Sequence, residues 1–336
     1  MEKNRRTSKA NFPLSHRQLA FLFNQLKQLE TAGLPVSQAF ATVAKSEVRL
    51  KRPLLMMQQQ INAGRSISEA GSRAGIFNDT LKALVNAGEA SGNLAGIYGQ
   101  LADYYGGLDR RIQKMKSRLI LPVLVLAIAL FVQPLPALVG SKINGIGYLQ
   151  LSLGRLLVIG MGVMLLIRLP AIVTGLSGGN AWHRLQLRLP MVADWVTRRQ
   201  INGFLVILAM MLEAGIAFAA ALPKATATIS NHALREQFSP ALALLGTGTS
   251  VTDCLKSVAA IDPKLLGIIH SSEQSGKLAS GLWHYTQMEA RTLSLQDDAL
   301  AEWLPRLAYS LIALWIAYTI VVTKMGTISA ATDTYV

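Results

Sequence analysis

The chain contains one unit twice. Residues 64–69 (Gly-Arg-Ser-Ile-Ser-Glu) recur as residues 248–253 (Gly-Thr-Ser-Val-Thr-Asp). Residues 89–94 recur as residues 273–278 with the same spacing of 184 positions (64 to 248 and 89 to 273), so no insertion separates the two matches. A long apolar stretch follows each copy. The chain is therefore a duplicated unit in which a polar domain leads into a membrane segment, and this organisation constrains the fold more than any single residue.

Three apolar stretches are long enough to cross a bilayer as helices. They cover residues 119–139, 149–172 and 303–324. Pro122 and Pro305 lie near the starts of the first and third stretches, where a proline disturbs a helix least. We predict that the first two stretches form a membrane hairpin and that the third crosses alone.

Two arginines, Arg155 and Arg168, interrupt the second stretch. Their separation corresponds to about 20 Å along a helix, so the two side chains can extend toward opposite membrane surfaces. Two alternatives stay open: the arginines line an ion or substrate path, or the stretch enters the membrane and returns without crossing it. A further arginine, Arg306, lies at the start of the third stretch.

The net charge of +14 is concentrated before the first stretch, because residues 1–118 carry 18 Lys and Arg against 8 Asp and Glu. Five cations directly precede that stretch: Arg110, Arg111, Lys114, Lys116 and Arg118. The positive-inside rule therefore predicts a cytoplasmic N-terminus. The hairpin returns the chain to the cytoplasm, and the third stretch sends the C-terminal tail to the other side of the membrane. Since no aromatic residues are interleaved with these charges, we expect contact with the lipid bilayer and no nucleic-acid partner.

The predicted fold is all-α, with two repeated cytoplasmic antiparallel helix-bundle domains and three transmembrane helices. Ser15 and Gln18 form a capping-box pattern before a run of apolar residues at helical spacing. Cys254, the single cysteine, excludes an internal disulfide and fits a reducing compartment. The predicted parts are a basic tail (1–14), the first copy (15–118), the membrane hairpin (119–176), the second copy (177–302), the third membrane helix (303–324) and a periplasmic tail (325–336).

Residues 204–222 of the second copy are nearly uncharged and raise the question of a fourth membrane span. The matching residues 19–34 of the first copy are amphipathic. A span here would also put the later halves of the two copies on opposite sides of the membrane. We therefore expect a buried hairpin or a partner-facing surface, and the second possibility would suit a homodimer or a higher homo-oligomer.

The sequence lacks the common catalytic motifs. Gly276-Lys277 is followed by leucine and has no glycine five positions earlier, so it is not a phosphate-binding P-loop. The five histidines show no paired metal-ligand spacing, and Gly64-x-Ser66 lacks the second glycine of a nucleophile elbow. We expect no catalytic residue, no cofactor and no metal, and hence a protein that is not an enzyme.

The repeated Glu-x-Ser-Gly-x-Leu motif is the most specific pattern in the chain. We expect Gly92 and Gly276 to end helices, which places Glu89 and Glu273 in last turns. A carboxylate there opposes the helix dipole by ~0.3–1 kcal/mol, so a compensating contact is expected. Three interpretations stay open: contact within the same domain, contact with a partner protein, and catalysis.

These motifs, in the same order in both copies, resemble the inner-membrane platform proteins of type II secretion and type IV pilus assembly (the GspF/PilC family). The resemblance covers about residues 15–325, and Ser272 departs from it by replacing a glycine. The matching positions are Gly33, Gly64, Glu89, Ser91 and Gly92 in the first copy and Gly215, Gly248, Glu273, Ser275 and Gly276 in the second.

The resemblance implies a non-enzymatic inner-membrane platform that couples a cytoplasmic hexameric assembly ATPase to the insertion of prepilin or pseudopilin subunits into a fibre. Other inner-membrane assembly proteins are implied as further partners. The candidate ATPase-facing residues are Arg65, Arg73, Lys82, Glu89 and Glu273. Arg155 and Arg168 are candidates for contact with acidic pilin groups. The alternatives are a small oligomeric membrane transporter or channel, and a membrane-tethered enzyme.

Overall fold

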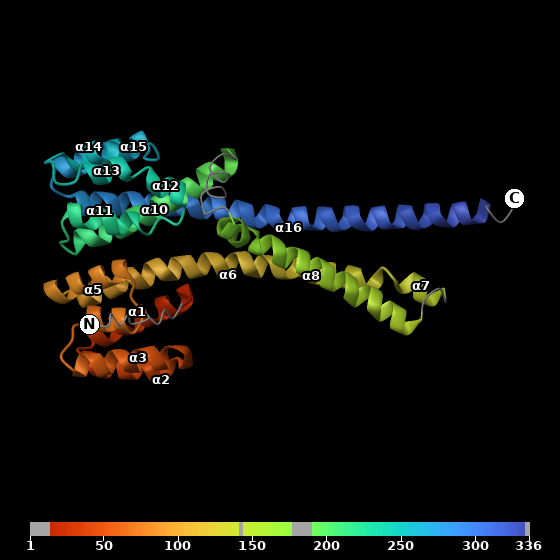
Figure 1. Cartoon of the computed structure of the whole chain (residues 1–336), viewed down its shortest axis with the longest axis horizontal. Helices are drawn as coiled ribbons and strands as arrows, with labels where there is room; N and C mark the ends of the chain where they lie inside the picture. Colours follow the sequence, from red (N-terminus) through yellow and green to blue (C-terminus); the bar gives the residue numbers. More distant parts are fainter. Residues whose placement is uncertain (1–13, 141–143, 177–189, 333–336) are drawn as a thin grey trace, which may run out of the picture. The chain divides into compact units, whose positions relative to one another are not determined.

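The computed structural model describes residues 14–140, 144–176 and 190–332, and within these ranges the chain forms helices and turns without strands (Figure 1). The chain divides into two compact units. The helical unit comprises residues 1–110 and 179–293, and the membrane unit comprises residues 111–178 and 294–336. The predicted all-α fold is confirmed. The predicted basic tail, residues 1–14, and the start of the predicted second copy, residues 177–189, lie almost wholly outside the described residues.

The helices of the two copies match in order. The first copy contains α1 (His16–Thr31), α2 (Val36–Ser46), α3 (Val48–Asn62), α4 (Ile67–Arg73), α5 (Asp79–Ser91) and the start of α6 (Leu94–Val132). The second copy contains α10 (Pro190–Glu213), α11 (Phe218–Thr226), α12 (His232–Glu236), α13 (Ser239–Ala243), α14 (Val251–Lys256), α15 (Pro263–Gln274) and the start of α16 (Leu278–Thr332). From α4 and α14 onward, equivalent helices begin at the spacing seen in the sequence (67 to 251, 79 to 263, 94 to 278).

Helix starts follow from side-chain caps, which satisfy backbone N–H groups that have no partner inside the helix. Ser15 and Gln18 form the predicted capping box of α1. The hydroxyl groups of Ser66 and Ser250 accept hydrogen bonds from the first turns of α4 and α14, at 3.2 and 3.0 Å. Because these caps occupy equivalent positions, the same local chemistry starts the same helix in both copies.

Helix ends in both copies depend on glycine. Gly33 after α1 and Gly215 after α10 have φ angles of 72° and 81°, in the left-handed region that residues with a side chain rarely adopt. The glycines of the repeated Glu-x-Ser-Gly motif end α5 and α15 in the same way. Each copy thus changes direction at the same points, and the helix ends predicted at Gly92 and Gly276 are present.

The nearly uncharged stretch of the second copy lies in the core of the helical unit. Phe204, Leu205, Leu208 and Met211 of α10 have no exposed surface and belong to one cluster of buried residues that extends through both copies. The expectation of a buried hairpin therefore holds for α10. A partner-facing surface is excluded for these four side chains because they are buried within the chain, but it stays a prediction for α11, where Ala219 and Ala220 are exposed.

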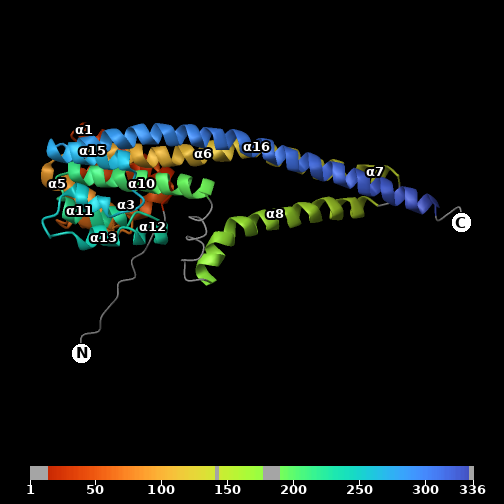
Figure 2. The same ribbon diagram turned by 90° about the horizontal axis from the view of Figure 1, so that it is seen from above.

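The two copies are in contact within the helical unit. The helix α5 of the first copy packs against α10 and α11 of the second (Figure 2). The hydroxyl of Thr80 donates to the carbonyl oxygen of Lys224 at 3.4 Å, and the amide of Gln100 donates to the carboxylate of Glu213 at 2.8 Å. The duplicated domains therefore form one body with a shared core.

The membrane unit contains the apolar parts of three long helices: α6, α8 (Gly145–Leu176) and α16. All three are long and apolar enough to cross a bilayer, as predicted. The first predicted stretch reaches residue 139, but α6 ends at Val132, before Pro134, and the short helix α7 (Leu135–Val139) follows. α8 is one continuous helix, which favours a crossing over a re-entrant loop.

Candidate functional site

The carboxylate of Glu89 reaches from the last turn of α5 to the start of α4. One oxygen accepts a hydrogen bond from the backbone N–H of Ile67 at 2.6 Å, and the other accepts from the N–H of Ser68 at 3.1 Å. These two N–H groups belong to the first turn of α4, where helical partners are lacking and the dipole is positive. The contact with the start of α4 therefore offsets the unfavourable interaction between the Glu89 carboxylate and the dipole at the end of α5.

Glu273 repeats this contact in the second copy. Its carboxylate accepts from the N–H of Val251 at 2.6 Å, from the N–H of Thr252 at 2.9 Å and from the hydroxyl of Thr252 at 2.6 Å. Burial by itself would raise the pKa of the Glu273 carboxyl, but the hydrogen bonds from Thr252 and Val251 outweigh it and hold the pKa below its ordinary value. Glu273 is thus an ionised clamp between consecutive helices, and Glu89 makes the equivalent contact in the first copy.

The clamps favour the interpretation that each glutamate acts within its own domain. Both carboxylate oxygens are already hydrogen-bonded in each copy, and the groups donating to them are backbone N–H groups and a threonine hydroxyl. Such an environment stabilises the charge and offers no acid or nucleophile to a substrate. The neighbouring motif residues Ser91 and Ser275 donate their hydroxyls to backbone carbonyls of the same last turns. Contact of Glu89 or Glu273 with a partner stays a prediction.

The three basic residues predicted to face an ATPase lie around α4 and α5. Arg73 and Lys82 are exposed, whereas Arg65 is half-buried. The Nη1 atom of Arg65 is enclosed without a hydrogen-bond partner in the described part of the chain. The three cations come from different places in the first copy: Arg65 precedes α4, Arg73 ends α4 and Lys82 lies in α5.

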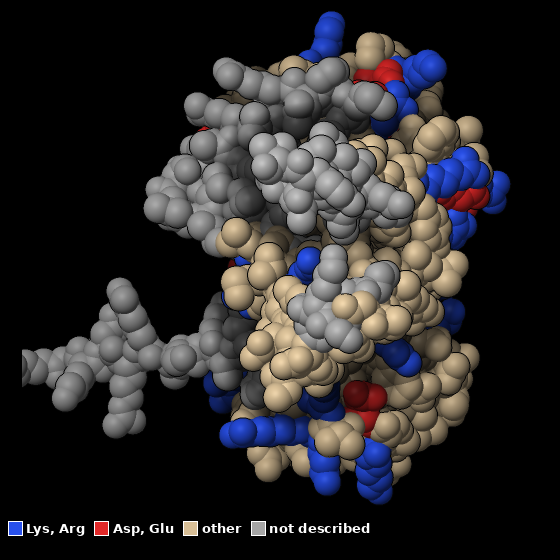
Figure 3. Space-filling model, turned by 90° about the vertical axis from the view of Figure 1, so that its right-hand side faces the viewer, with Lys and Arg blue, Asp and Glu red and all other residues tan. Residues whose placement is uncertain are grey.

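A more concentrated basic surface lies on α2 and α3, and motif analysis missed it. Four exposed cations form this basic face: Lys45, Arg49, Lys51 and Arg52. Three exposed apolar side chains accompany them: Val48, Leu55 and Met56, with Val48 88% exposed. Basic side chains gather along the lower edge of the molecule in Figure 3, on the side where α2 and α3 lie in Figure 1. In the second copy, α3 is replaced by the short helices α12 and α13, so this face has no counterpart there.

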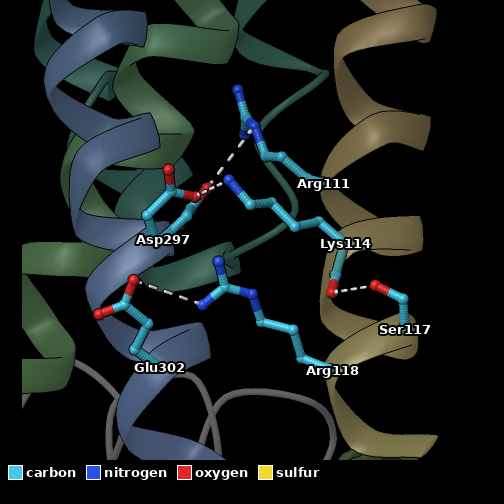
Figure 4. Close-up of polar contacts among 7 residues, drawn as sticks. Arg111, Lys114, Ser117, Arg118, Asp297 and Glu302 are labelled. Atoms are coloured by element: carbon cyan, nitrogen blue, oxygen red, sulfur yellow. Dashed lines mark hydrogen bonds and ion pairs between the residues drawn. The ribbon is translucent and has the colours of Figure 1, made fainter.

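Three ion pairs connect α6 and α16 just before the predicted membrane stretches (Figure 4). Arg111 pairs with Asp297 at 3.7 Å, Lys114 pairs with Asp298, and Arg118 pairs with Glu302 at 3.7 Å. We call this set the charge ladder. All its cations come from the first copy and all its carboxylates from the second. Three of the five cations that predict the membrane orientation are therefore matched by acidic groups of the same chain.

Arg155 lies in a cavity of the membrane unit with a volume of about 410 Å³. Its guanidinium donates to the side-chain oxygen of Gln133 at 2.6 Å. The cavity is lined by Gln150, Leu151, Gly154, Arg155, Val158 and Ile159 of α8 and by Trp315 of α16. Arg168, farther along α8, is exposed. The two arginines therefore differ: one is held at a partly apolar cavity and the other lies open on the helix.

The remaining predicted membrane residues lie within the long helices. Pro122 is inside α6 and Pro305 inside α16. The guanidinium of Arg306 lies 5.4 Å from the centre of the Trp303 ring, close enough for a cation–π contact. Within the ranges that the structure describes, no group of three or more His, Cys, Asp or Glu side chains is arranged to hold a metal ion.

Comparison with known proteins matches both copies of the chain. The family model of the type II secretion system (T2SS) protein F matches residues 22–140 and 204–325, which together exceed two thirds of the sequence. The type II secretion system protein F of Pseudomonas aeruginosa is 28% identical over 313 residues, covering 86% of this chain and 75% of the relative. The protein of the same name from Aeromonas hydrophila is 25% identical and covers 90% and 84%. The type IV pilus assembly protein PilC of Thermus thermophilus is 25% identical and covers 84% and 74%.

Proposed function

Since the chain belongs to the family of the type II secretion system protein F, we propose that it is a non-enzymatic platform of a type II secretion or type IV pilus machine in the bacterial inner membrane. The observation that carries the proposal is the family match, which covers both copies of the chain, at residues 22–140 and 204–325. The three apolar helices support a place in the membrane. The cations before the first span support a cytoplasmic N-terminus and a periplasmic C-terminus.

The platform would couple a cytoplasmic hexameric assembly ATPase to fibre growth. In the first copy, the basic face of α2 and α3 is the strongest candidate for contact with an acidic surface of such an ATPase, because four cations and three apolar side chains are exposed together. Arg65, Arg73 and Lys82 extend the candidate surface to α4 and α5. Charge complementarity of this kind guides association and selects partners more than it adds affinity.

The membrane unit would contact prepilin or pseudopilin subunits. Arg155 is the better candidate of the two arginines, because its cavity combines a guanidinium with the apolar side chains of Leu151, Val158 and Trp315. A carboxylate within an apolar helix would find there both a charge partner and an apolar wall. Arg168 offers only an exposed charge. Other inner-membrane assembly proteins and a second copy of the chain are further proposed partners.

The experiment that tests the proposal is an affinity capture of the tagged protein from chemically crosslinked native membranes, followed by mass spectrometry. We expect a hexameric ATPase of the secretion type and prepilin-like proteins among the captured partners. Variants with the basic face reversed, such as R49E/R52E, should lose the ATPase while they keep the pilins. If neither partner is captured with an intact and abundant bait, the platform proposal fails, and flux of solutes across reconstituted vesicles would test the transporter or channel instead.

A further inference from the structure

Two rungs of the charge ladder join residues at equivalent positions of the duplicated sequence. Lys114 and Asp298 are 184 positions apart. Arg118 and Glu302 have the same spacing (118 to 302). This is the spacing that relates the two copies, so each of these residues contacts its own counterpart. The third ion pair, between Arg111 and Asp297, has a spacing of 186 positions (111 to 297), two more than the repeat spacing.

Contact between counterparts indicates a parallel pair of helices related by an approximate two-fold axis. Along the ladder the residue numbers of α6 and α16 rise together, from 111 and 297 to 118 and 302, so the helices run in the same direction. In such a pair, equivalent positions on the inner faces lie opposite each other, as in a parallel coiled coil. The steps of three and four residues between Arg111, Lys114 and Arg118 place all three cations on one face of α6.

The charges at these positions have diverged between the copies. If α6 paired in this geometry with α6 of another chain, Lys114 would oppose Lys114 and Arg118 would oppose Arg118. If α16 paired with itself, carboxylates would oppose carboxylates. Juxtaposed like charges disfavour both arrangements, whereas α6 with α16 places opposite charges together at every rung. This asymmetry between the copies distinguishes one partner helix from the others.

We propose that the charge ladder is a recognition surface through which α6 of the first copy selects α16 of the same chain at the entry to the membrane. Two properties suit the ladder to this role. The Asp297 side chain is 12% exposed and that of Arg111 is 27% exposed, so this rung is shielded from the salt that screens surface charges. The ladder also lies directly before the apolar parts of both helices, where it sets which spans enter the bilayer side by side.

A zero-length carbodiimide crosslink in native membranes tests the proposal directly, because the reagent joins an amine and a carboxylate only when they touch. Lys114 and Asp298 should give a crosslinked peptide by mass spectrometry. The crosslink should fall to background in K114E and in D298K, and it should return in the swapped variant K114E/D298K. K116E is the matched control, because Lys116 lies on the same helix and its counterpart (116 to 300) is the apolar Leu300. In this control the Lys114–Asp298 crosslink should keep its wild-type yield.

Expression of the K114E and D298K chains in the same cell separates pairing within a chain from pairing between chains. Neither single variant can form the rung by itself, but a Lys114 of one chain could meet an Asp298 of the other. We expect no crosslink in the mixture. A restored crosslink would place the rung between chains and overturn the assignment to one chain. The recognition role is refuted if the swapped variant gives no crosslink, or if it accumulates in the membrane no better than the single variants.

Discussion

The two copies share their turns and caps but differ in their surfaces. Ser66 and Ser250 start equivalent helices, and Glu89 and Glu273 clamp equivalent pairs of helices. Apart from these shared caps and clamps, the first copy exposes a basic face on α2 and α3, whereas the second has two short helices in the place of α3. The contacts that make the fold are thus the same in both copies, whereas the exposed surfaces differ.

The comparison also accounts for the serine that departs from the family pattern. In the first copy, Gly88 leaves room for Ile97, whose side chain would lie 3.1 Å from an added Cβ. In the second copy the equivalent positions hold Ser272 and Gly281, with the small residue on the other helix. A Cβ at Gly281 would lie 1.9 Å from the Ser272 hydroxyl oxygen. Both copies therefore pair one glycine with one larger residue between these two helices, but the glycine is on α5 in the first copy and on α16 in the second.

The largest expected effect comes from removing the glutamate clamps. Glu273→Ala leaves three donors at the start of α14 without their charged acceptor, and Glu89→Ala leaves two donors at the start of α4. We expect a loss of about 2–3 kcal/mol for Glu273→Ala and a smaller loss for Glu89→Ala, because hydrogen bonds to charged groups are the stronger kind. Denaturant unfolding of the detergent-solubilised protein measures both. Equal losses would mean that the hydroxyl of Thr252 adds nothing to the second clamp.

The exchange between Ser272 and Gly281 predicts the next largest effect. Gly281→Ala should destabilise the protein by about 1–3 kcal/mol through overpacking against Ser272, despite the higher helix propensity of alanine. The matched control is Gly267→Ala in α15, where an added Cβ meets nothing within 4 Å and stability should rise by up to about 1 kcal/mol. The double variant S272G/G281A should recover most of the loss. If it does not, the two positions do not share one space.

Local patterns in the sequence predicted the helix starts and the membrane helices, because the interactions that form them are local. The capping serines and the three apolar stretches each act within one helix or one turn, so their consequences follow from spacing alone. The destination of the Glu89 carboxylate could not be predicted, because it depends on how α5 folds back on α4. The family resemblance did not supply it either, since a repeated motif indicates a shared role without naming the contact.

The basic face and the charge ladder were missed for a related reason. The cations of α3 are visible in the sequence, but only the burial of Leu50, Leu54 and Met57 decides which side of the helix stays exposed. Predicting the charge ladder would also have required knowing that α6 and α16 lie side by side as a parallel pair. Given that arrangement, the repeat spacing alone would have matched Lys114 with Asp298. The burial of α10 likewise follows from a core built jointly by both copies.

A smaller effect, dependent on pH, distinguishes the charge of Glu273 from its shape. Because the folded state holds the pKa of Glu273 below its ordinary value, the ionised clamp contributes its full stability above the unfolded pKa, about 4.3. That contribution is lost as the pH falls from there through the folded pKa. Glu273→Gln keeps the shape and removes the titration, so its stability should decline less steeply over this acidic range. Unfolding curves measured between neutral and acidic pH would show parallel profiles if the charge were unimportant.

The smallest expected effect on stability comes from the basic face that distinguishes the first copy. Reversing Arg49 and Arg52 should change the free energy of unfolding by no more than about 0.5 kcal/mol, because both side chains are exposed and surface charges contribute little to folding. Binding should respond strongly, since a surface that matches an acidic partner would now repel it. The control is charge reversal of Lys264 and Lys277, exposed cations of the second copy, which should leave capture of the ATPase unchanged. If R49E/R52E still captured the ATPase, the basic face that distinguishes the first copy from the second would not be what selects this partner.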